Sequence, residues 1–420
     1  MPAKSSSKSS STPASNRILR NVLRGFLELA VVLLSFAAGA STYYIWPQRL
    51  DMNGRGAPGL QREGHNWVAP TLAGALYVPA GDFDSELAAY LQYDYLRGRP
   101  ETRDHSVFLT VRETANAPRY EIRVELENDL LRAIPLIARL NARHLVPGTE
   151  FKYSTRAELA RDRRQTEIFE TAYSGPVRRK LEEFTAGELL SPVATFLVFK
   201  SRTDRRIHHV DMAALSGEEA DQLAADIITV ADFYSLPLEL LLGVGAMENN
   251  YLNVDGDLDH RVWKRRPEKD DIVLRRTRRR VLVLNYSIGR WQITRDTLRH
   301  AHKLFLHDTR DYSQLPERLR PARQLDFATL DSHVMTTYAG LLLRDLLDRF
   351  PGEMADAIGA YNGGIKNPNP EYAAGVAQVA GYARSVLEHS VSMGSLPPSP
   401  RNRPEALIPA VETLAPRVTP

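Results

Sequence analysis

The chain has 420 residues, of which 43% are hydrophobic and 25% are charged. This composition supports a sizeable folded core and excludes a wholly disordered or collagen-like protein. There is no cysteine, which excludes disulfides, zinc ribbons, iron–sulfur clusters and cysteine nucleophiles. The formal net charge is +3, and five basic residues without an acid lie in the first 25 positions. The remainder is therefore nearly neutral and gives no general argument for nucleic-acid binding.

The N-terminal residues carry the pattern of a membrane anchor. Residues 1–25 are basic and rich in serine, which predicts a disordered tail. Residues 26–46 are apolar except for Glu28 and a few small polar residues, and they are long enough to cross a bilayer as a helix. The positive charges before them predict a cytoplasmic N-terminus, so the rest of a single-pass inner-membrane protein would lie on the periplasmic, extracytoplasmic side. The run Ala38-Gly39-Ala40 leaves a cleaved signal peptide as the alternative.

A linker at 47–65 and an α+β accessory region at 66–215 are predicted next. Alternating apolar residues predict one hairpin over 107–126 and a second formed by 195–200 and 206–211. Helices are expected over 129–145 and 157–183. The region contains no chemical motif, so a spacer and a substrate-guiding module both remain open.

The chain becomes helical from Ser216, which fits a capping box with Glu219. The following helix, 238–247, is apolar nearly all round and should be buried. Glu248 stands at its C-terminal end. Burial and the negative end of the helix dipole both favour the protonated acid, as a general acid requires. The alternative is an exposed carboxylate in the polar loop that follows.

Three later stretches change the balance between these alternatives. They are Ser287-Ile-Gly-Arg-Trp-Gln-Ile293, Gly359-Ala-Tyr-Asn-Gly-Gly364 and a terminal amphipathic helix around Tyr382. Together with Met247-Glu248-Asn249, and in this order, they resemble the Slt-type lytic transglycosylases of the lysozyme-like superfamily. The resemblance covers about 120 of the 420 residues. It implies a mainly α-helical lysozyme-like domain over 216–391 within an α+β protein. Residues 392–420 contain too many prolines for regular structure, which predicts a disordered tail.

The resemblance also implies an activity. Glu248 would be the general acid/base that cleaves the β-1,4 bond between N-acetylmuramic acid and N-acetylglucosamine in peptidoglycan, leaving a 1,6-anhydromuramoyl product. The positions that match the substrate-binding motifs are Asn249, Ser287, Gly289, Gln292, Tyr361 and Asn362. The partners would be peptidoglycan glycan strands and the inner membrane; no cofactor, metal or nucleic acid is implied. A hydrolytic muramidase that uses the same Glu248 and a non-catalytic glycan-binding envelope scaffold are the alternatives.

The chain departs from the family pattern at two motif positions. Asn249 replaces the serine that follows the catalytic glutamate, and Arg290-Trp291 replaces a Leu-Met pair. Asparagine can also hydrogen-bond, so we expect a tuned site rather than a lost one. Trp291 could stack on a sugar ring but is favoured as a core residue, and a core tyrosine is the alternative for Tyr361.

Two charged segments between Glu248 and Gly289 need separate interpretation. Residues 261–280 hold ten basic and three acidic residues, a pattern typical of a solvated loop. Contact with an anionic polymer or with phospholipid headgroups is the alternative. Alternating oxygen donors precede this segment, at Asn253, Asp255, Asp257 and Asp259. Because the loop lacks the glycine and terminal glutamate of an EF-hand, a polar turn is expected rather than a calcium site.

Overall fold

The computed structural model describes residues 61–63, 66–68, 74–115, 117–126, 130–177, 179–203, 212–256 and 259–394. The predicted tail, the predicted anchor at 26–46 and most of the proline-rich tail lie outside these ranges. Residues 1–73 and 74–420 form two separate units. In the first, β1 (Gln61–Glu63) and β2 (Asn66–Val68) pair antiparallel. No helix among the described residues combines the length and the apolar character needed to cross a bilayer.

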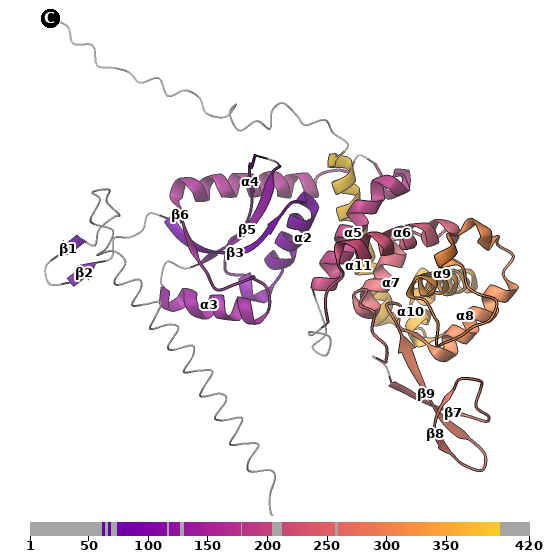
Figure 1. The fold of residues 1–420 in the computed structure, drawn as a ribbon. Coiled ribbons are helices and arrows are strands. Elements are labelled where there is room, and N and C mark those ends of the chain that lie inside the picture. Colours follow the sequence, from indigo (N-terminus) through magenta and orange to yellow (C-terminus); the bar gives the residue numbers. More distant parts are fainter. Residues whose placement is uncertain are drawn as a thin grey trace, which may run out of the picture. The chain divides into compact units, whose positions relative to one another are not determined.

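The second unit begins with a four-stranded antiparallel sheet (Figure 1). Its strands are β3 (Gly74–Phe83), β4 (Val107–Arg112), β5 (Arg119–Leu126) and β6 (Lys152–Thr155), in the order β4-β5-β3-β6. The predicted hairpin over 107–126 is confirmed as β4 and β5, with Leu109 opposite Ile122. Both side chains are fully buried, so the alternation that predicted the strands marks the face that builds the core.

Helices α2 (Glu86–Arg97) and α4 (Arg156–Ser174) pack with this sheet, and α3 (Leu130–Ala142) contributes to the same hydrophobic core. A capping box between Thr155 and Glu158 starts α4 at the end of β6. Thr166 of α4 then accepts a 3.0 Å hydrogen bond from the Leu109 amide, which fixes α4 against β4. The predicted helix over 157–183 is shorter than expected, because α4 ends at Ser174. A 3-10 turn at Leu181–Glu183 follows near the predicted end.

The second predicted hairpin is wrong in its first strand. Residues 195–200 lie inside helix α5 (Ala186–Arg202), and 206–211 lie outside the described residues. A capping box of Thr185 and Glu188 starts α5, and its buried residues recur at helical spacing: Leu189, Val193, Phe196 and Leu197. The run Thr195–Lys200 alternates by coincidence, because this short window hides the longer helical period.

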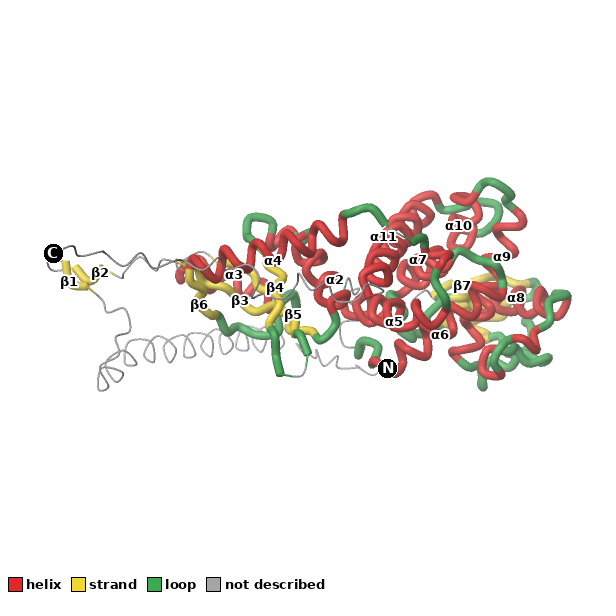
Figure 2. The backbone as a smooth tube through the Cα atoms, turned by 90° about the horizontal axis from the view of Figure 1, so that it is seen from above, coloured by secondary structure: helices red, strands yellow, loops and turns green. Residues whose placement is uncertain are grey.

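The C-terminal part is an α-helical core that includes α5 (Figure 2). Its other helices are α6 (Gly217–Phe233), α7 (Leu238–Asn249), α8 (Arg295–His307), α9 (Ser332–Arg349), α10 (Met354–Gly363) and α11 (Pro370–Gly394). The predicted capping box of Ser216 and Glu219 is present at α6. Because α5 packs closely with α6 and also contacts α11, the helical core begins before the expected boundary at residue 216. It also ends three residues later than expected, since α11 reaches Gly394.

A second antiparallel sheet joins α7 to α8. It contains β7 (Asp259–Lys264), β8 (Ile272–Arg276), β9 (Val281–Ile288) and the short β10 (Ile293–Thr294). β9 is central and pairs with the other three strands. Nine of the 20 residues of the basic segment 261–280 lie in β7 and β8, so the expectation of a solvated loop is wrong for those nine. The charges in this segment make it resemble a loop in the sequence. It forms two strands because both pair with β9, whose residues are apolar and alternately buried.

Candidate functional site

Glu248 lies in the last turn of α7 and is nearly buried, with 8% of its surface exposed. The helix ends directly after it because Asn250 and Tyr251 both adopt positive φ angles of 48° and 62°. The Tyr372 hydroxyl donates a 2.6 Å hydrogen bond to Glu248 Oε1. The expectation that this carboxylate ends a buried helix is confirmed, and the alternative of an exposed loop residue is wrong.

Close packing of α7 against α11 brings Tyr372 to Glu248. A Cβ added at Gly243 would lie 2.8 Å from the Val376 carbonyl oxygen, so only glycine permits this approach. Asn369 caps the start of α11 by accepting hydrogen bonds from the Glu371 and Tyr372 amides at 3.1 and 3.2 Å. The glycine fixes the separation of the two helices, and the cap fixes the first turn of α11 where Tyr372 stands.

Tyr372 has the electrostatics of a permanent donor. Its burial and the nearby charge of Glu248 hold the Tyr372 pKa well above the ordinary tyrosine value. The same two causes raise the pKa of Tyr361. Two protonated phenols therefore lie near the carboxylate. The sequence did not single out Tyr372, because nothing in its spacing shows that the first turn of α11 meets the last turn of α7.

The end of β9 and the turn that follows it contain three of the predicted site residues. The Ser287 hydroxyl hydrogen-bonds to Gln292 Oε1, and Gln292 Nε2 donates to the Gly289 and Val254 carbonyls, both at 2.7 Å. Gly289 has a φ of 65°, and its amide donates to Asp255 Oδ1 at 2.9 Å. The side chains of Ser287 and Gln292 are buried. This network ties the turn to the loop that follows Glu248.

Trp291 and Tyr361 connect that turn to the helices. Trp291 is fully buried, and its indole donates a 3.1 Å hydrogen bond to Thr336 Oγ1, so the expectation of a core residue is confirmed. Tyr361, at the end of α10, donates to the Trp291 carbonyl at 3.3 Å. Tyr361 thus supports the turn from one side and approaches Glu248 from the other.

The two predicted asparagines have different environments. Asn249 is buried and donates a 3.4 Å hydrogen bond to the Leu252 carbonyl, within the loop that leaves α7. Asn362 is exposed, and its Oδ1 accepts a 2.9 Å hydrogen bond from Asn369. Asn362 therefore contacts the residue that caps α11, and Asn249 shapes the backbone next to Glu248.

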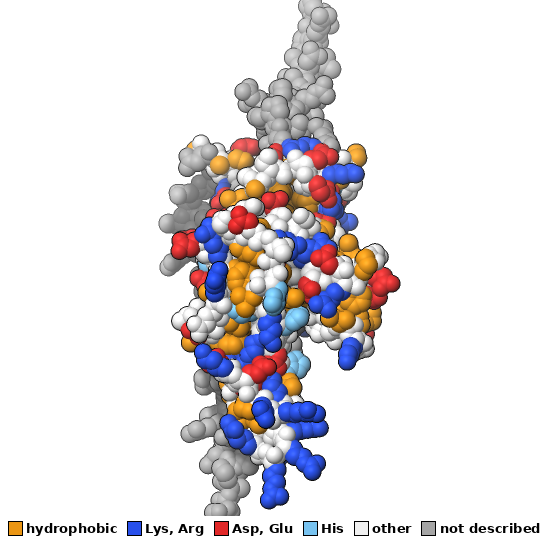
Figure 3. Space-filling model, turned by 90° about the vertical axis from the view of Figure 1, so that its right-hand side faces the viewer, with side chains coloured by type: hydrophobic (Ala, Val, Ile, Leu, Met, Phe, Trp, Pro, Cys, Tyr) orange, Lys and Arg blue, Asp and Glu red, His pale blue; other side chains and the backbone are white. Residues whose placement is uncertain are grey.

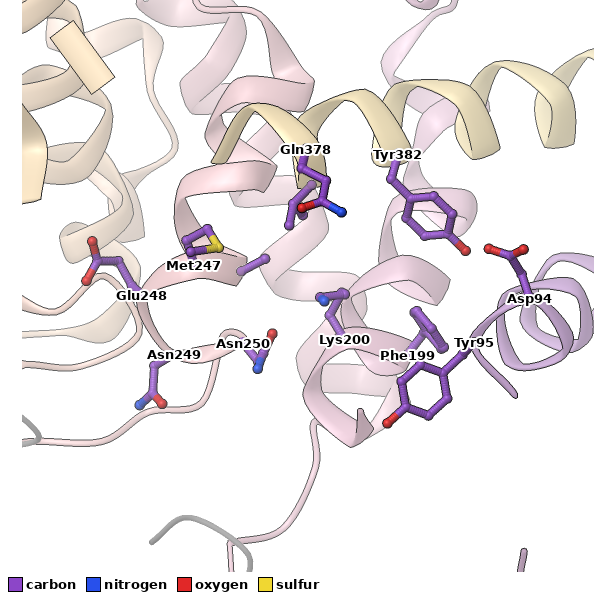
Figure 4. Close-up of a pocket in the computed structure, with 12 residues that line it drawn as sticks. Asp94, Tyr95, Phe199, Lys200, Met247, Glu248, Asn249, Asn250, Gln378 and Tyr382 are labelled. Atoms are coloured by element: carbon purple, nitrogen blue, oxygen red, sulfur yellow. The ribbon is translucent and has the colours of Figure 1, made fainter. Parts of the chain in front are cut away.

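A cleft of about 470 Å³ opens beside the C-terminal end of α7. Figure 4 shows Glu248 at one end, with Met247 and Gln378 between it and Tyr382. Residues that sequence reasoning did not single out line the far end: Asp94 and Tyr95 of α2, with Phe199 and Lys200 of α5. The accessory region thus contributes to the wall of the cleft. Asp94, its second carboxylate, lies at the far end beside Tyr382, whose pKa is raised by burial and by the Asp94 charge.

One group of carboxylates among the described residues has the spacing of a metal site: Glu268, Asp271 and Asp296. Lys264 Nζ lies 3.6, 3.2 and 2.6 Å from their oxygens. Arg299 pairs with the same three residues. Two cations already neutralise the cluster, so it is an ion-pair network rather than a metal centre. In the loop with alternating oxygen donors, Asp255 accepts a hydrogen bond from the Gly289 amide, and Asp257 lies outside the described residues.

Comparison of the chain with protein-family models, with curated proteins and with solved structures finds no match in any of the three.

Proposed function

We propose that the protein is a peptidoglycan lytic transglycosylase in which Glu248 is the general acid/base. The observation that carries the proposal is the single carboxylate at the end of a buried helix, at the edge of a cleft and hydrogen-bonded by Tyr372. A nearly buried carboxylic acid that faces phenol donors can hold and return one proton. The motif order that resembles Slt-type enzymes supplies the substrate class.

The reaction needs only that one acid. Glu248 protonates the glycosidic oxygen as the bond from C1 of N-acetylmuramic acid breaks, and the acetamido oxygen of the same sugar attacks C1. The Glu248 carboxylate then takes the proton from the C6 hydroxyl of that sugar, and C6–O closes onto C1 as the acetamido group leaves. The product is a 1,6-anhydro sugar, and no water is consumed.

The remaining site residues have three different roles in the proposed reaction. Tyr372 holds one carboxylate oxygen in place and restricts the rotation of the side chain. Ser287, Gly289 and Gln292 are positioning residues, because their hydrogen bonds hold the loop after Glu248. Tyr361 and Asn362 flank the start of α11 and are the candidates for contact with the sugar acetamido group.

Glu248→Gln tests the proposal directly. The amide keeps the size of the side chain and can still accept the Tyr372 hydrogen bond, but it cannot protonate the leaving oxygen. A positioned acid contributes about 10²–10⁴-fold to the rate, so the variant should release no detectable anhydro-muropeptides from purified sacculi while it stays folded. Glu239→Gln is the matched control, because Glu239 begins the same helix and pairs with Arg384. Wild-type digestion by Glu248→Gln would overturn the site assignment.

Mass spectrometry of the products separates the two enzyme classes. A hydrolytic muramidase would use the same Glu248 with water in place of the C6 hydroxyl, and its products would each be one water heavier than the anhydro form. If neither wild type nor variant cleaves glycan yet both bind it, a glycan-binding envelope scaffold becomes the better description.

The site of action follows from the N-terminal pattern. With residues 26–46 as an uncleaved anchor, the catalytic unit would work on glycan strands on the periplasmic side of the inner membrane. The protein should then sediment with membranes and resist high-salt washing. A soluble mature form that starts at Ser41 would instead establish a cleaved signal peptide.

A further inference from the structure

The sheet of β7, β8 and β9 carries a charge pattern that the proposed catalysis does not use. Between Arg261 and Arg280 the sequence has a net formal charge of +7. Two of the three acidic residues, Glu268 and Asp271, pair with Lys264 and Arg299 near the base of the sheet. The outer arginines are exposed: Arg265, Arg266, Arg275, Arg276, Arg278, Arg279 and Arg280. Figure 3 shows basic side chains gathered at its lower end, where Figure 1 has β7 and β8.

The strand register shows which side chains share the outer face of this sheet. The residues of β9 alternate, with Val281, Val283 and Asn285 buried and the residues between them only half-buried. Directly paired residues of an antiparallel sheet lie on one face. Trp263 pairs with Leu282, and Ile272 pairs with Leu284, so these four apolar side chains share the half-buried face.

This face leaves large apolar groups in contact with solvent. Trp263 is 43% exposed and Ile272 42%, and Leu274, 46% exposed, stands at the register shift of β8 between Val273 and Arg275. They account for three of the ten large apolar side chains that are exposed among the described residues. Arg275 pairs with Leu282 and so lies on this face, and the turn Thr277–Arg280 continues from the end of β8. The turn is closed by Thr277, which hydrogen-bonds with the backbone of Arg280 at 2.9 and 3.0 Å, so Arg278 and Arg279 stand at its apex.

We infer that this face, formed by β7, β8, β9 and the turn Thr277–Arg280, docks onto the surface of an anionic phospholipid bilayer. Charge complementarity supplies the attraction, because guanidinium groups bind phosphate oxygens in a bidentate manner. The apolar groups select a bilayer over a soluble polyanion. A polyanion needs only the arginines, whereas a membrane interface also buries tryptophan and aliphatic side chains.

Docking of this face would place the cleft at a fixed orientation to the membrane. β9 leads directly into the Ser287–Gln292 turn, which is tied to the loop after Glu248. A sheet held at the bilayer would therefore hold that turn and the end of α7 at a fixed distance from the membrane surface, set by the length of β9. The docking itself depends on lipid charge and on apolar exposure, and it would occur whether or not Glu248 is catalytic.

A fluorescent probe on the face can test the inference in the full chain. The protein lacks cysteine, so Leu274→Cys gives one labelling position for an environment-sensitive dye. The labelled protein is reconstituted into vesicles of phosphatidylcholine alone or of phosphatidylcholine and phosphatidylglycerol in equal parts. In the anionic vesicles we expect a blue shift of the emission, quenching by spin-labelled lipid, and reversal of both at high salt. Leu306→Cys is the matched control, because Leu306 is exposed on α8, and its dye should not respond.

Two variants separate the contributions of charge and apolar surface. Replacement of Arg275, Arg276, Arg278 and Arg279 by glutamate should abolish the shift and the quenching, and circular dichroism should show the fold intact because all four side chains are exposed. Replacement of Trp263 and Ile272 by serine should abolish lipid quenching while the arginines still bind soluble polyphosphate. Equal shifts in neutral and anionic vesicles, no shift in either, or the same shift with polyphosphate in the absence of lipid would each overturn membrane docking. The last result would favour a soluble polyanion.

Discussion

Tyr372 donates a 2.6 Å hydrogen bond to Glu248 across 124 residues of sequence. The bond joins the first turn of α11 to the last turn of α7, at the point where a cleft opens. Because burial and the Glu248 charge raise the Tyr372 pKa well above its ordinary value, the phenol remains a donor at any physiological pH. Orientation of the carboxylate by a neutral donor is thus built into the packing of two helices.

Tyr372→Phe removes this hydrogen bond and leaves the ring in place. A hydrogen bond to a charged group contributes about 1.5–3 kcal/mol, which corresponds to ~10–100-fold in rate if it is made mainly in the transition state. We expect kcat for release of anhydro-muropeptides to fall by that factor with little change in KM. Trp291→Phe, which removes a donor from the core and not from Glu248, is the comparison. An unchanged kcat in Tyr372→Phe would show that the hydroxyl plays no part in the reaction.

Gly243→Ala should destabilise the protein although alanine is the better helix former. The added Cβ would meet the Val376 carbonyl at 2.8 Å, and such overpacking costs about 1–3 kcal/mol. Gly381→Ala, in α11, meets no atom within 4 Å. It should stabilise by up to ~1 kcal/mol through helix propensity. Chemical unfolding of the two variants beside wild type gives both values, and equal effects would argue against close contact of α7 and α11.

Local rules predicted much of the structure that surrounds the site. The Ser216 capping box, the apolar helix before Glu248 and the hairpin at 107–126 each depend on residues close together in sequence, and each is confirmed. The failures have two causes. In β7 and β8, Val262-Trp263 and Ile272-Val273-Leu274 do favour strands, but each run is short and lies among charges, and it is pairing with β9 that makes them strands. The alternation of residues 195–200 predicts a strand, whereas their helical period shows only over the whole of α5.

Sequence rules that depend on neighbouring residues also predicted only part of the candidate site. Glu248, Gln292 and Tyr361 could be singled out from motifs, but Tyr372 and the cleft wall from α2 and α5 could not. Those residues meet Glu248 only through tertiary packing between distant segments. The resemblance assigns Ser287 and Gln292 to substrate binding, whereas in the structure their side chains hydrogen-bond within the turn.

Arg384→Met should destabilise the helical core by about 2 kcal/mol. Arg384 of α11 pairs with Glu239 of α7 at 2.7 Å, with Glu388 at 3.1 Å and with Glu182. Its loss leaves two largely buried carboxylates without this partner, and a fully buried pair broken in this way costs ~3–5 kcal/mol. The smaller figure allows for the partial exposure of Arg384. Arg349→Met, which breaks an exposed pair with Asp345 on α9, should change the unfolding free energy by less than ~0.5 kcal/mol. Similar values for both variants would contradict the assignment of Arg384 as a cross-link between α7 and α11.

His302 should make the stability of the protein fall as the pH drops below neutral. Its ring is buried in α8 between the Tyr338 hydroxyl, 2.8 Å from Nδ1, and the Arg323 carbonyl, 3.2 Å from Nε2. Burial lowers the His302 pKa below its ordinary value near 6.5. The unfolded chain then binds the proton more readily than the folded chain. The contribution of the neutral His302 ring to the free energy of unfolding is therefore fully present above the unfolded pKa, and it is lost as the pH falls towards the lower folded pKa. Between about pH 7 and pH 5, the unfolding free energy of wild type should therefore decrease more than that of His302→Gln, which cannot titrate.

His307→Gln replaces an exposed histidine at the end of the same helix and should follow wild type. Parallel pH profiles for wild type and His302→Gln would show that His302 carries no part of the acid sensitivity.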